Sequence, residues 1–365
     1  MKCKMEDALE CIIDYRGKTP KKSDSGIMTL SAKSVRDGYI DYSQCYFISP
    51  EEYDRFMVRG FPQVGDVLLT TEAPLGMVAR LDRSDVALAQ RLLTLRGKEG
   101  ILDTGFLYCY LRSSIGQQKL KERQTGTTVT GIKQAEFRKI DIDLPAYHEQ
   151  KQIAHIIETL EQKIRKNSKI NDNLAQQAQL IYDNTFITNA DQNWPLVRLS
   201  DLITVKYGKD HKKLSDGSYP VYGSGGVMRY VERPLYEKES VLIPRKGSLN
   251  NVIYVDEPFW SVDTMFYTEM KHPNIAKYIY YYLNGKNLAA LNAGSAVPSM
   301  TTDILNAMEV HLPDANTLEN FEKTVNPLFK MIKKNATESN MLANLRDSLL
   351  PRLMSGELDV SEVSI

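Results

Sequence analysis

The chain contains an internal repeat, and this feature restricts its architecture more than any other. Leu144-Pro145 recurs as Leu312-Pro313, at an offset of 168 residues. The same offset aligns Gly126 with Gly294 and continues without a gap to Leu349. A chain of 365 residues is too long for one ordinary core. The repeat therefore predicts two similar domains, each followed by a connecting segment.

The first part of each copy is predicted to be a globular domain of mixed structure. Short β-branched and aromatic runs such as Val67–Thr70 and Val241–Ile243 are bounded by Gly, Pro and Asp, which is typical of strands. Thr104–Leu111 and Ile275–Leu283 are expected to be short helices that pack on those strands. These expectations place the chain in the α+β class, with two pseudo-repeated α/β domains.

The second part of each copy is predicted to be a long helix. Apolar positions recur there with alternating steps of four and three, which is a heptad pattern. The seam consists of Ile153, Ile157, Leu160, Ile164, Asn167 and Leu174 in the first copy, and of Phe321, Val325, Leu328, Ile332, Asn335 and Leu342 in the second. The matching polar positions, Asn167 and Asn335, favour an antiparallel coiled coil between the two helices over two helices that each lie only on their own domain. Because a proline inside a helix removes a hydrogen bond, we expect a bend or a late helix start at Pro327.

Total charge is uninformative, but its distribution is not. Lys plus Arg and Asp plus Glu each number 46, which gives a formal net charge of zero. Positive charge is nevertheless concentrated in residues 16–36, 112–139 and 205–250, where Gly, Ser, Thr and Tyr are interspersed. Loops of this composition supply N–H groups, hydroxyls and cations to phosphates and base edges. The alternative for any one of these loops is an ordinary solvated surface with turn glycines.

Composition and motifs argue against export and against catalysis. The four cysteines, Cys3, Cys11, Cys45 and Cys109, form no C-x-x-C pair, so neither a disulfide framework nor a zinc site is indicated. The sequence has no 18-residue apolar run and its start is too polar for a signal peptide, which predicts a cytoplasmic protein that does not enter a membrane.

Sequence motifs of nucleotide-binding or metal-dependent enzymes are absent. No phosphate-binding loop, dinucleotide fingerprint or H-E-x-x-H motif is present. Asp263, Glu269 and Lys271 resemble a nuclease pattern, but this spacing is common by chance and the first copy lacks it. His148 and His155 lie one heptad apart and are expected on the surface or the partner face of the first helix and not in a site. We therefore predict a chain that is not an enzyme and binds no metal.

Several motifs together resemble the specificity subunits of type I restriction-modification systems over nearly the whole chain. They are Asp141-Ile-Asp-Leu-Pro145 before Glu149-Gln-Lys-Gln-Ile153, Tyr219-Pro-Val-Tyr-Gly-Ser-Gly-Gly226, Pro244-Arg-Lys-Gly-Ser248 with Val255-Asp-Glu-Pro-Phe-Trp260, and Leu349-Leu-Pro-Arg-Leu-Met-Ser-Gly-Glu-Leu358. The second copy opens with Trp194-Pro-Leu-Val-Arg-Leu199, the usual entry to these domains. The first begins at Met1-Lys-Cys-Lys, so we expect its start to be shortened.

The resemblance implies a division of the chain and a role for each part. Residues 1–144 and 191–312 would be target-recognition domains, each reading one half of a bipartite site in double-stranded DNA. Residues 145–190 and 313–365 would be spacer helices that set the separation and dock two methyltransferase subunits. Those partners would bind S-adenosylmethionine and methylate adenine N6, and a restriction subunit, where the system has one, would bind ATP and magnesium. The chain itself would hold no cofactor.

Within this interpretation, the likeliest DNA contacts are polar residues of the basic segments. They are Arg16, Lys18, Lys33, Arg123, Thr127 and Lys133 in the first domain, and Lys209, Lys212, Lys213, Ser224, Arg245 and Lys246 in the second. Two other classes of protein remain as alternatives. One is a coiled-coil adaptor that binds proteins and does not read DNA, and the other is a stand-alone nuclease or methyltransferase with two DNA-binding lobes.

Overall fold

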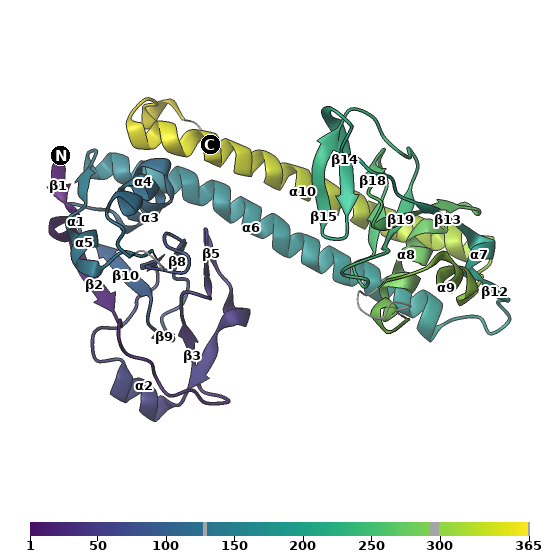
Figure 1. Ribbon diagram of the computed structural model, residues 1–365, viewed down its shortest axis with the longest axis horizontal. Coiled ribbons are helices and arrows are strands. Elements are labelled where there is room, and N and C mark those ends of the chain that lie inside the picture. Colours follow the sequence, from purple (N-terminus) through teal and green to yellow (C-terminus); the bar gives the residue numbers. More distant parts are fainter. Residues whose placement is uncertain (127–129, 292–298, 364–365) are drawn as a thin grey trace. The chain divides into compact units, whose positions relative to one another are not determined.

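The computed structural model describes residues 1–126, 130–291 and 299–363 (Figure 1). The chain divides into two compact units. Unit 1 comprises Met1–Asn167 and Ala336–Ile365, and unit 2 comprises Ser168–Asn335. Each unit combines one globular part with segments of the two long helices, α6 (Tyr147–Asp183) and α10 (Ala315–Ser355).

Unit 1 is built on a four-stranded antiparallel sheet in the order β2-β10-β7-β8. These strands are β2 (Leu9–Asp14), β10 (Leu92–Gly97), β7 (Val67–Thr70) and β8 (Val78–Arg80). A three-stranded sheet consists of β6 (Tyr46–Ile48), β3 (Ile27–Leu30) and β9 (Ala87–Leu88). In addition, β1 (Lys2–Lys4) pairs with β11 (Asp141–Asp143), and β4 (Val35–Arg36) pairs with β5 (Tyr39–Ile40). The short helices are α1 (Met5–Ala8), α2 (Pro50–Phe56), α3 (Thr104–Arg112), α4 (Ser114–Glu122) and α5 (Gln134–Arg138).

Unit 2 repeats this plan, except that its described residues contain no counterpart of the β4–β5 pair. Its four-stranded sheet has the order β13 (Ile203–Tyr207), β19 (Met265–Met270), β16 (Ser240–Pro244), β17 (Ile253–Val255). Its three-stranded sheet has the order β15 (Gly226–Val231), β14 (Asp216–Gly223), β18 (Trp260–Ser261), and β12 (Leu196–Arg198) pairs with β20 (Glu309–His311). The helices are α7 (Leu199–Leu202), α8 (Ala276–Asn284) and α9 (Thr302–Ala307). In both three-stranded sheets the middle strand runs parallel to the last one, β3 to β9 and β14 to β18.

The central strands explain why the two units share this plan. β7 and β16 are buried along their whole length, as expected for strands covered on both faces. In unit 1, Leu69 faces a core shared with the long helices while Leu68 faces a second core beneath the three-stranded sheet. In unit 2, Ile243 likewise faces the core shared with the long helices, and Leu242 faces the core beneath the three-stranded sheet. Alternation along a strand therefore fixes which face receives the helices and which receives the smaller sheet.

The two long helices pair antiparallel, and contacts within each unit show the direction. In unit 1, Lys163 Nζ lies 3.6 Å from Glu338 Oε1, and Asn167 Nδ2 donates to Glu338 Oε2 at 2.7 Å. In unit 2, Asn335 Nδ2 donates to Asn171 Oδ1 at 2.9 Å. All twelve seam side chains are buried or half-buried. The predicted α+β class with an antiparallel coiled coil is confirmed.

Two details differ from the sequence expectations. α10 begins at Ala315 and runs through Pro327, so a late start at that proline is wrong. Pro327 is exposed, and water can satisfy the carbonyl group that its missing N–H leaves free. The first copy also contains β1 and α1, the counterparts of β12 and α7, so the segment from Leu196 to Leu202 does have an equivalent there.

In the described part of the chain, none of the helices is both long and apolar enough to cross a lipid bilayer.

Candidate nucleic-acid interface

Three loops of unit 2 converge beside the segment that joins β18 to β19. Lys209 follows β13, and its N–H donates to Ser261 O at 2.8 Å. Arg245 follows β16, and its N–H donates to Thr264 O at 2.8 Å. Gly208 permits the close approach, since a Cβ at that position would lie 2.0 Å from Val262 O. The backbone thus holds Lys209 and Arg245 on opposite sides of one short segment.

The third loop, the turn between β14 and β15, brings Ser224 to the same place. Asn251 Nδ2 donates to Ser224 O at 2.6 Å. Gly247 has a positive φ of 83°, which glycine adopts readily, and a Cβ there would lie 3.4 Å from Ser224 Oγ. We call Lys209, Ser224, Arg245, Lys246 and Asn251 the second loop cluster.

Arg245 is held in place by an aromatic ring and a carbonyl group. Its guanidinium lies 5.3 Å from the ring centre of Tyr207, which is 51% exposed, and its Nη1 donates to Asp263 O at 3.2 Å. Lys246 and Lys209 are exposed. An arginine stacked on an exposed ring, with lysines beside it, suits a polyanion that presents flat bases and phosphates.

Lys212 and Lys213 lie in the turn that leads into β14, and both are exposed. The N–H of Lys212 donates to Asp210 Oδ1 at 3.0 Å, and this hydrogen bond lowers the pKa of the Asp210 carboxyl group. An acid therefore lies beside the two lysines.

Unit 1 has the same backbone frame at the equivalent loop. Thr71, the counterpart of Arg245 in the repeat, donates its N–H to Arg91 O at 3.0 Å and accepts from Ile132 N at 2.9 Å. Arg245 O likewise accepts from Met300 N at 2.9 Å. Bridges join Glu72 to Gly131 in unit 1 and Lys246 to Ser299 in unit 2. The two units therefore present corresponding loops on corresponding strands.

The charges on the unit 1 frame are arranged differently. Arg91 Nε lies 2.7 Å from Glu72 Oε1, so the acid that replaces Lys246 has a cation beside it. Arg16 Nη2 donates to Ile132 O at 2.8 Å, which places Arg16 next to the exposed Lys133. We call Arg16, Thr71, Glu72, Arg91 and Lys133 the first loop cluster.

Lys18 and Lys33 are exposed. Lys33 lines a hollow of about 670 Å³ together with Lys22, Gln90 and Arg91. Lys22 Nζ lies 4.7 Å from the ring centre of Tyr46. The hollow thus joins the first loop cluster to further cations.

The remaining predicted contacts of unit 1 are less favourable. Arg123 Nη1 lies 3.5 Å from Glu136 Oε2, an acid that Lys139 also contacts at 2.7 Å. Part of the Arg123 charge is therefore already matched. Thr127 lies outside the described residues.

Several residues at these loops were not predicted from the sequence. Arg91, Gln90, Tyr207 and Asn251 lie outside the three densest basic segments or carry no charge, so charge density alone does not select them. The repeat was the usable signal, because extending it across β7 and β16 aligns Thr71 with Arg245 and directs attention to the strand ends that face them.

The nuclease-like pattern does not form a site. Asp263 precedes β19 and Glu269 lies near its other end, while Lys271 Nζ donates to Ser200 O at 2.6 Å. Within the part of the chain that the structure describes, no three His, Cys, Asp or Glu side chains are grouped to hold a metal ion. His148 and His155 lie exposed on α6.

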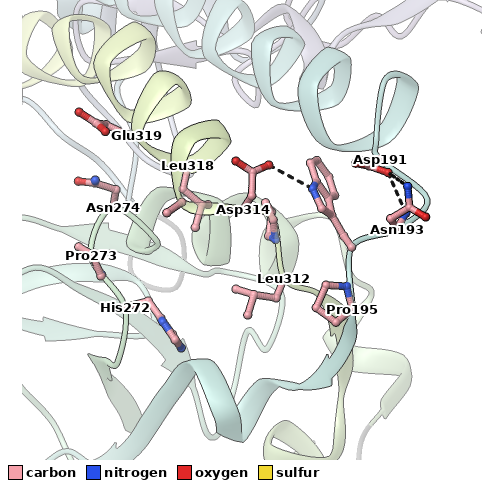
Figure 2. A pocket seen from close by; sticks show the side chains of 13 residues that line it. Asp191, Asn193, Pro195, His272, Pro273, Asn274, Leu312, Asp314, Leu318 and Glu319 are labelled. Atoms are coloured by element: carbon pink, nitrogen blue, oxygen red, sulfur yellow. Dashed lines mark hydrogen bonds between the residues drawn. The ribbon is translucent and has the colours of Figure 1, made fainter.

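A separate hollow of about 730 Å³ lies at the start of α10 (Figure 2). Asp191, Asp314 and Glu319 line it, and none of the described residues around it is Lys or Arg. Hydrogen bonds from Thr317 lower the pKa of Asp314, which also accepts from Trp194 Nε1 at 3.4 Å. A hollow with this lining does not suit a phosphate, so we do not assign it to nucleic acid.

The repeated loops lie within two matches to one family model. The model is described as the type I restriction modification DNA specificity domain, and it matches residues 38–176 and 191–345. The chain belongs to this type I specificity family. The first match begins after β4 and contains the later strands of unit 1 with part of α6, and the second contains the strands of unit 2 with part of α10.

Relatives of the type I specificity family cover most of the chain. The type I restriction enzyme MjaIX specificity subunit of Methanocaldococcus jannaschii is 24% identical over 349 residues, which span 84% of this chain and 80% of that protein. A putative type I specificity subunit of Mycoplasma pneumoniae is 24% identical over 279 residues, 69% of this chain and 72% of that protein. The crystal structure of a type I restriction-modification S subunit from M. genitalium has the same fold, with a TM-score of 0.68, 18% identity, and coverage of 97% of this chain and 95% of that one.

Proposed function

We propose that the chain selects a bipartite DNA site for partner enzymes. The globular part of each unit acts as a recognition domain for one half-site, through the loop cluster defined above. The long helices act as the spacer between them and as the surface on which two methyltransferase subunits dock, in the cytoplasm where the DNA lies. The domains are taken as residues 1–144 and 191–312, and the spacer segments as 145–190 and 313–365.

The observation that carries this proposal is the repeated loop frame. Thr71 and Arg245 make the same pair of backbone hydrogen bonds, and each frame is flanked by solvent-facing cations, Lys133 in one and Lys246 in the other. Two similar recognition domains in one chain suit a DNA site made of two separate half-sites, as two-fold related domains suit two stretches of one duplex. A coiled-coil adaptor that binds only proteins does not require solvent-facing cations beside both frames.

Catalysis is assigned to the partners. A methyltransferase subunit supplies S-adenosylmethionine and flips the target adenine, and a restriction subunit, where present, supplies ATP and magnesium chemistry. In this chain we assign no catalytic residue and no cofactor.

The test is to alter one loop cluster at a time in the complex with methyltransferase subunits. R245A with K246A should change or weaken recognition in one half of the methylated motif, and R16A with K133A should do so in the other half. Single-molecule sequencing of N6-methyladenine reads both halves at once. If both double variants alter the same half, or if neither alters any base preference, the assignment of one domain to one half-site is wrong.

A further inference from the structure

Each globular part is joined to a long helix by charged contacts, and these contacts lie at different positions in the two units. The first seat consists of Gly105 and Arg112 on α3, Ala154 and Glu161 on α6, and Arg346 on α10. The second seat consists of Lys277 and Asn284 on α8, Glu322 and Phe329 on α10, and Ala178 on α6. The internal repeat aligns the two sets, at an offset of 172 residues for the domain helices and 168 for the long helices.

In the first seat the charges surround Glu161, which is 6% exposed. Its carboxylate accepts the Tyr108 hydroxyl at 2.8 Å and forms an ion pair with Arg112. Arg346 Nη1 lies 3.9 Å away. Arg112 also contacts Asp37, with its Nε 2.7 Å from Oδ1. An acid of the long helix is thus enclosed by groups of the recognition domain.

Beside these charges, α3 and α6 are in close contact at Gly105, and Asp103 and Arg80 of the same domain lie next to this position. A Cβ added to Gly105 would lie 2.9 Å from the Cβ of Ala154. The two backbones therefore approach so closely that only small residues fit.

In the second seat the ion pair lies at the position that Gly105 and Ala154 occupy in the first. Lys277 takes the place of Gly105, is 2% exposed, and has its Nζ 2.6 Å from Oε1 of Glu322, which takes the place of Ala154. The ammonium also lies 4.9 Å from the ring centre of Tyr254 and 5.5 Å from that of Phe329. Phe329 takes the place of Glu161, so the site of the first ion pair is occupied by a ring.

Each change on a domain is accompanied by a change on the helix that it contacts. Gly and Ala in one seat become Lys and Glu in the other, while Arg, Glu and Arg become Asn, Phe and Ala. The second domain placed on the first seat would put Lys277 against Ala154, where Glu322 is absent and the close backbone approach leaves little room for its side chain. It would also put Asn284 in the place of Arg112, so that buried Glu161 loses its ion pair. A buried cation without its partner is strongly unfavourable, so such differences discriminate between seats.

We propose that these residues are positioning residues: they allow each recognition domain to pack on its own seat of the spacer and disfavour its packing on the other. This inference rests on the proposed function. A domain can then be exchanged between the two positions only together with the helix residues that match it. Specificity for the half-site order is thus built into the domain–helix contacts as well as into the loops.

The test uses two full-length chimeras in which residues 194–312 also replace residues 1–144. One keeps the first seat as it is, and the other carries A154E, E161F and R346A, which reproduce the second seat. Each is produced with the methyltransferase subunits, and methylated motifs are read by single-molecule sequencing. We expect the converted chimera to methylate a symmetric motif made of two copies of the second half-site, and the unconverted one to do so at least about tenfold less.

The matched control places the same three substitutions in the unaltered chain. They remove Glu161 from beneath Arg112, so methylation of the native motif should fall. Substitutions that help the chimera and harm the native chain cannot act through general destabilisation.

One result would overturn the inference: a converted chimera that methylates no more than the unconverted one. The wild-type chain serves as the reference for the proposed function. If the wild type directs no bipartite motif, the proposed function fails. If it does and the chimeras do not differ, only the matching of each domain to its seat fails.

Discussion

Removing lysines from the loops of unit 2 should lower the salt dependence of DNA binding by a calculable amount. Lys209, Lys212, Lys213 and Lys246 are exposed, and no carboxylate of the described residues lies within ion-pair distance of their ammonium groups. Because each is free to face a phosphate, replacing all four by Ala removes up to four contacts.

The magnitude follows from counterion release. Each neutralised phosphate contributes about 0.9 to the slope of log K against log salt concentration. If two to four of the lysines contact phosphate, the slope should fall by about 1.8 to 3.6. Affinity should fall similarly for specific and unrelated duplexes, since phosphate contacts carry little sequence information.

The assay is a fluorescence-anisotropy titration of the complex with methyltransferase subunits at several salt concentrations. A matched variant replaces Lys238, Lys271, Lys323 and Lys330, which removes the same charge from exposed positions of unit 2 outside the loop cluster. An unchanged slope in the loop variant, or an equal decrease in the matched variant, would refute the placement of DNA on these loops and favour the protein-binding adaptor.

Three further perturbations test the spacer, the first seat and the loop frame. Inserting seven residues after Lys169 in α6 and after Thr337 in α10 lengthens each helix by about 10 Å. The gap between half-sites in the methylated motif should then widen by about three base pairs. An unchanged gap would contradict the spacer role. E161A leaves Arg112, whose side chain is 7% exposed, without its Glu161 partner and should destabilise unit 1 by about 3–5 kcal/mol in thermal unfolding, with E161Q milder because it keeps a hydrogen-bond acceptor for Tyr108; wild-type stability of E161Q would show that the charge is unimportant. G208A forces a Cβ to within 2.0 Å of Val262 O and should cost about 1–3 kcal/mol in the same measurement, whereas wild-type stability would show that the loop can move aside.

The repeat predicted the fold because it constrained both copies at once. Val67–Thr70 and Val241–Ile243 were predicted as strands from their composition and also correspond in the repeat, and the structure contains them as β7 and β16. The heptad pattern predicted the long helices for a similar reason, since Asn167 and Asn335 coincide under the offset. Pro327 misled the prediction of the start of α10, because the cost of a proline depends on whether water reaches the freed carbonyl, which periodicity does not reveal.

The site was harder to predict than the fold because it is formed by residues distant in sequence. Arg91 lies in an apolar stretch and acquires its place through a hydrogen bond between its carbonyl group and Thr71, twenty residues earlier. Arg123 lies in a basic segment, but its partner Glu136 becomes apparent only when α5 is in place. Charge density therefore identifies basic regions, and only strand register shows which cations share a surface.

The most direct test of the central claim is single-molecule sequencing of N6-methyladenine in DNA from cells that carry the partner methyltransferase, with and without this chain. The account predicts that a motif of two short half-sites with a fixed gap is methylated only when the chain is present. Methylation of the same motif in its absence, or of a single undivided motif in its presence, would contradict the account.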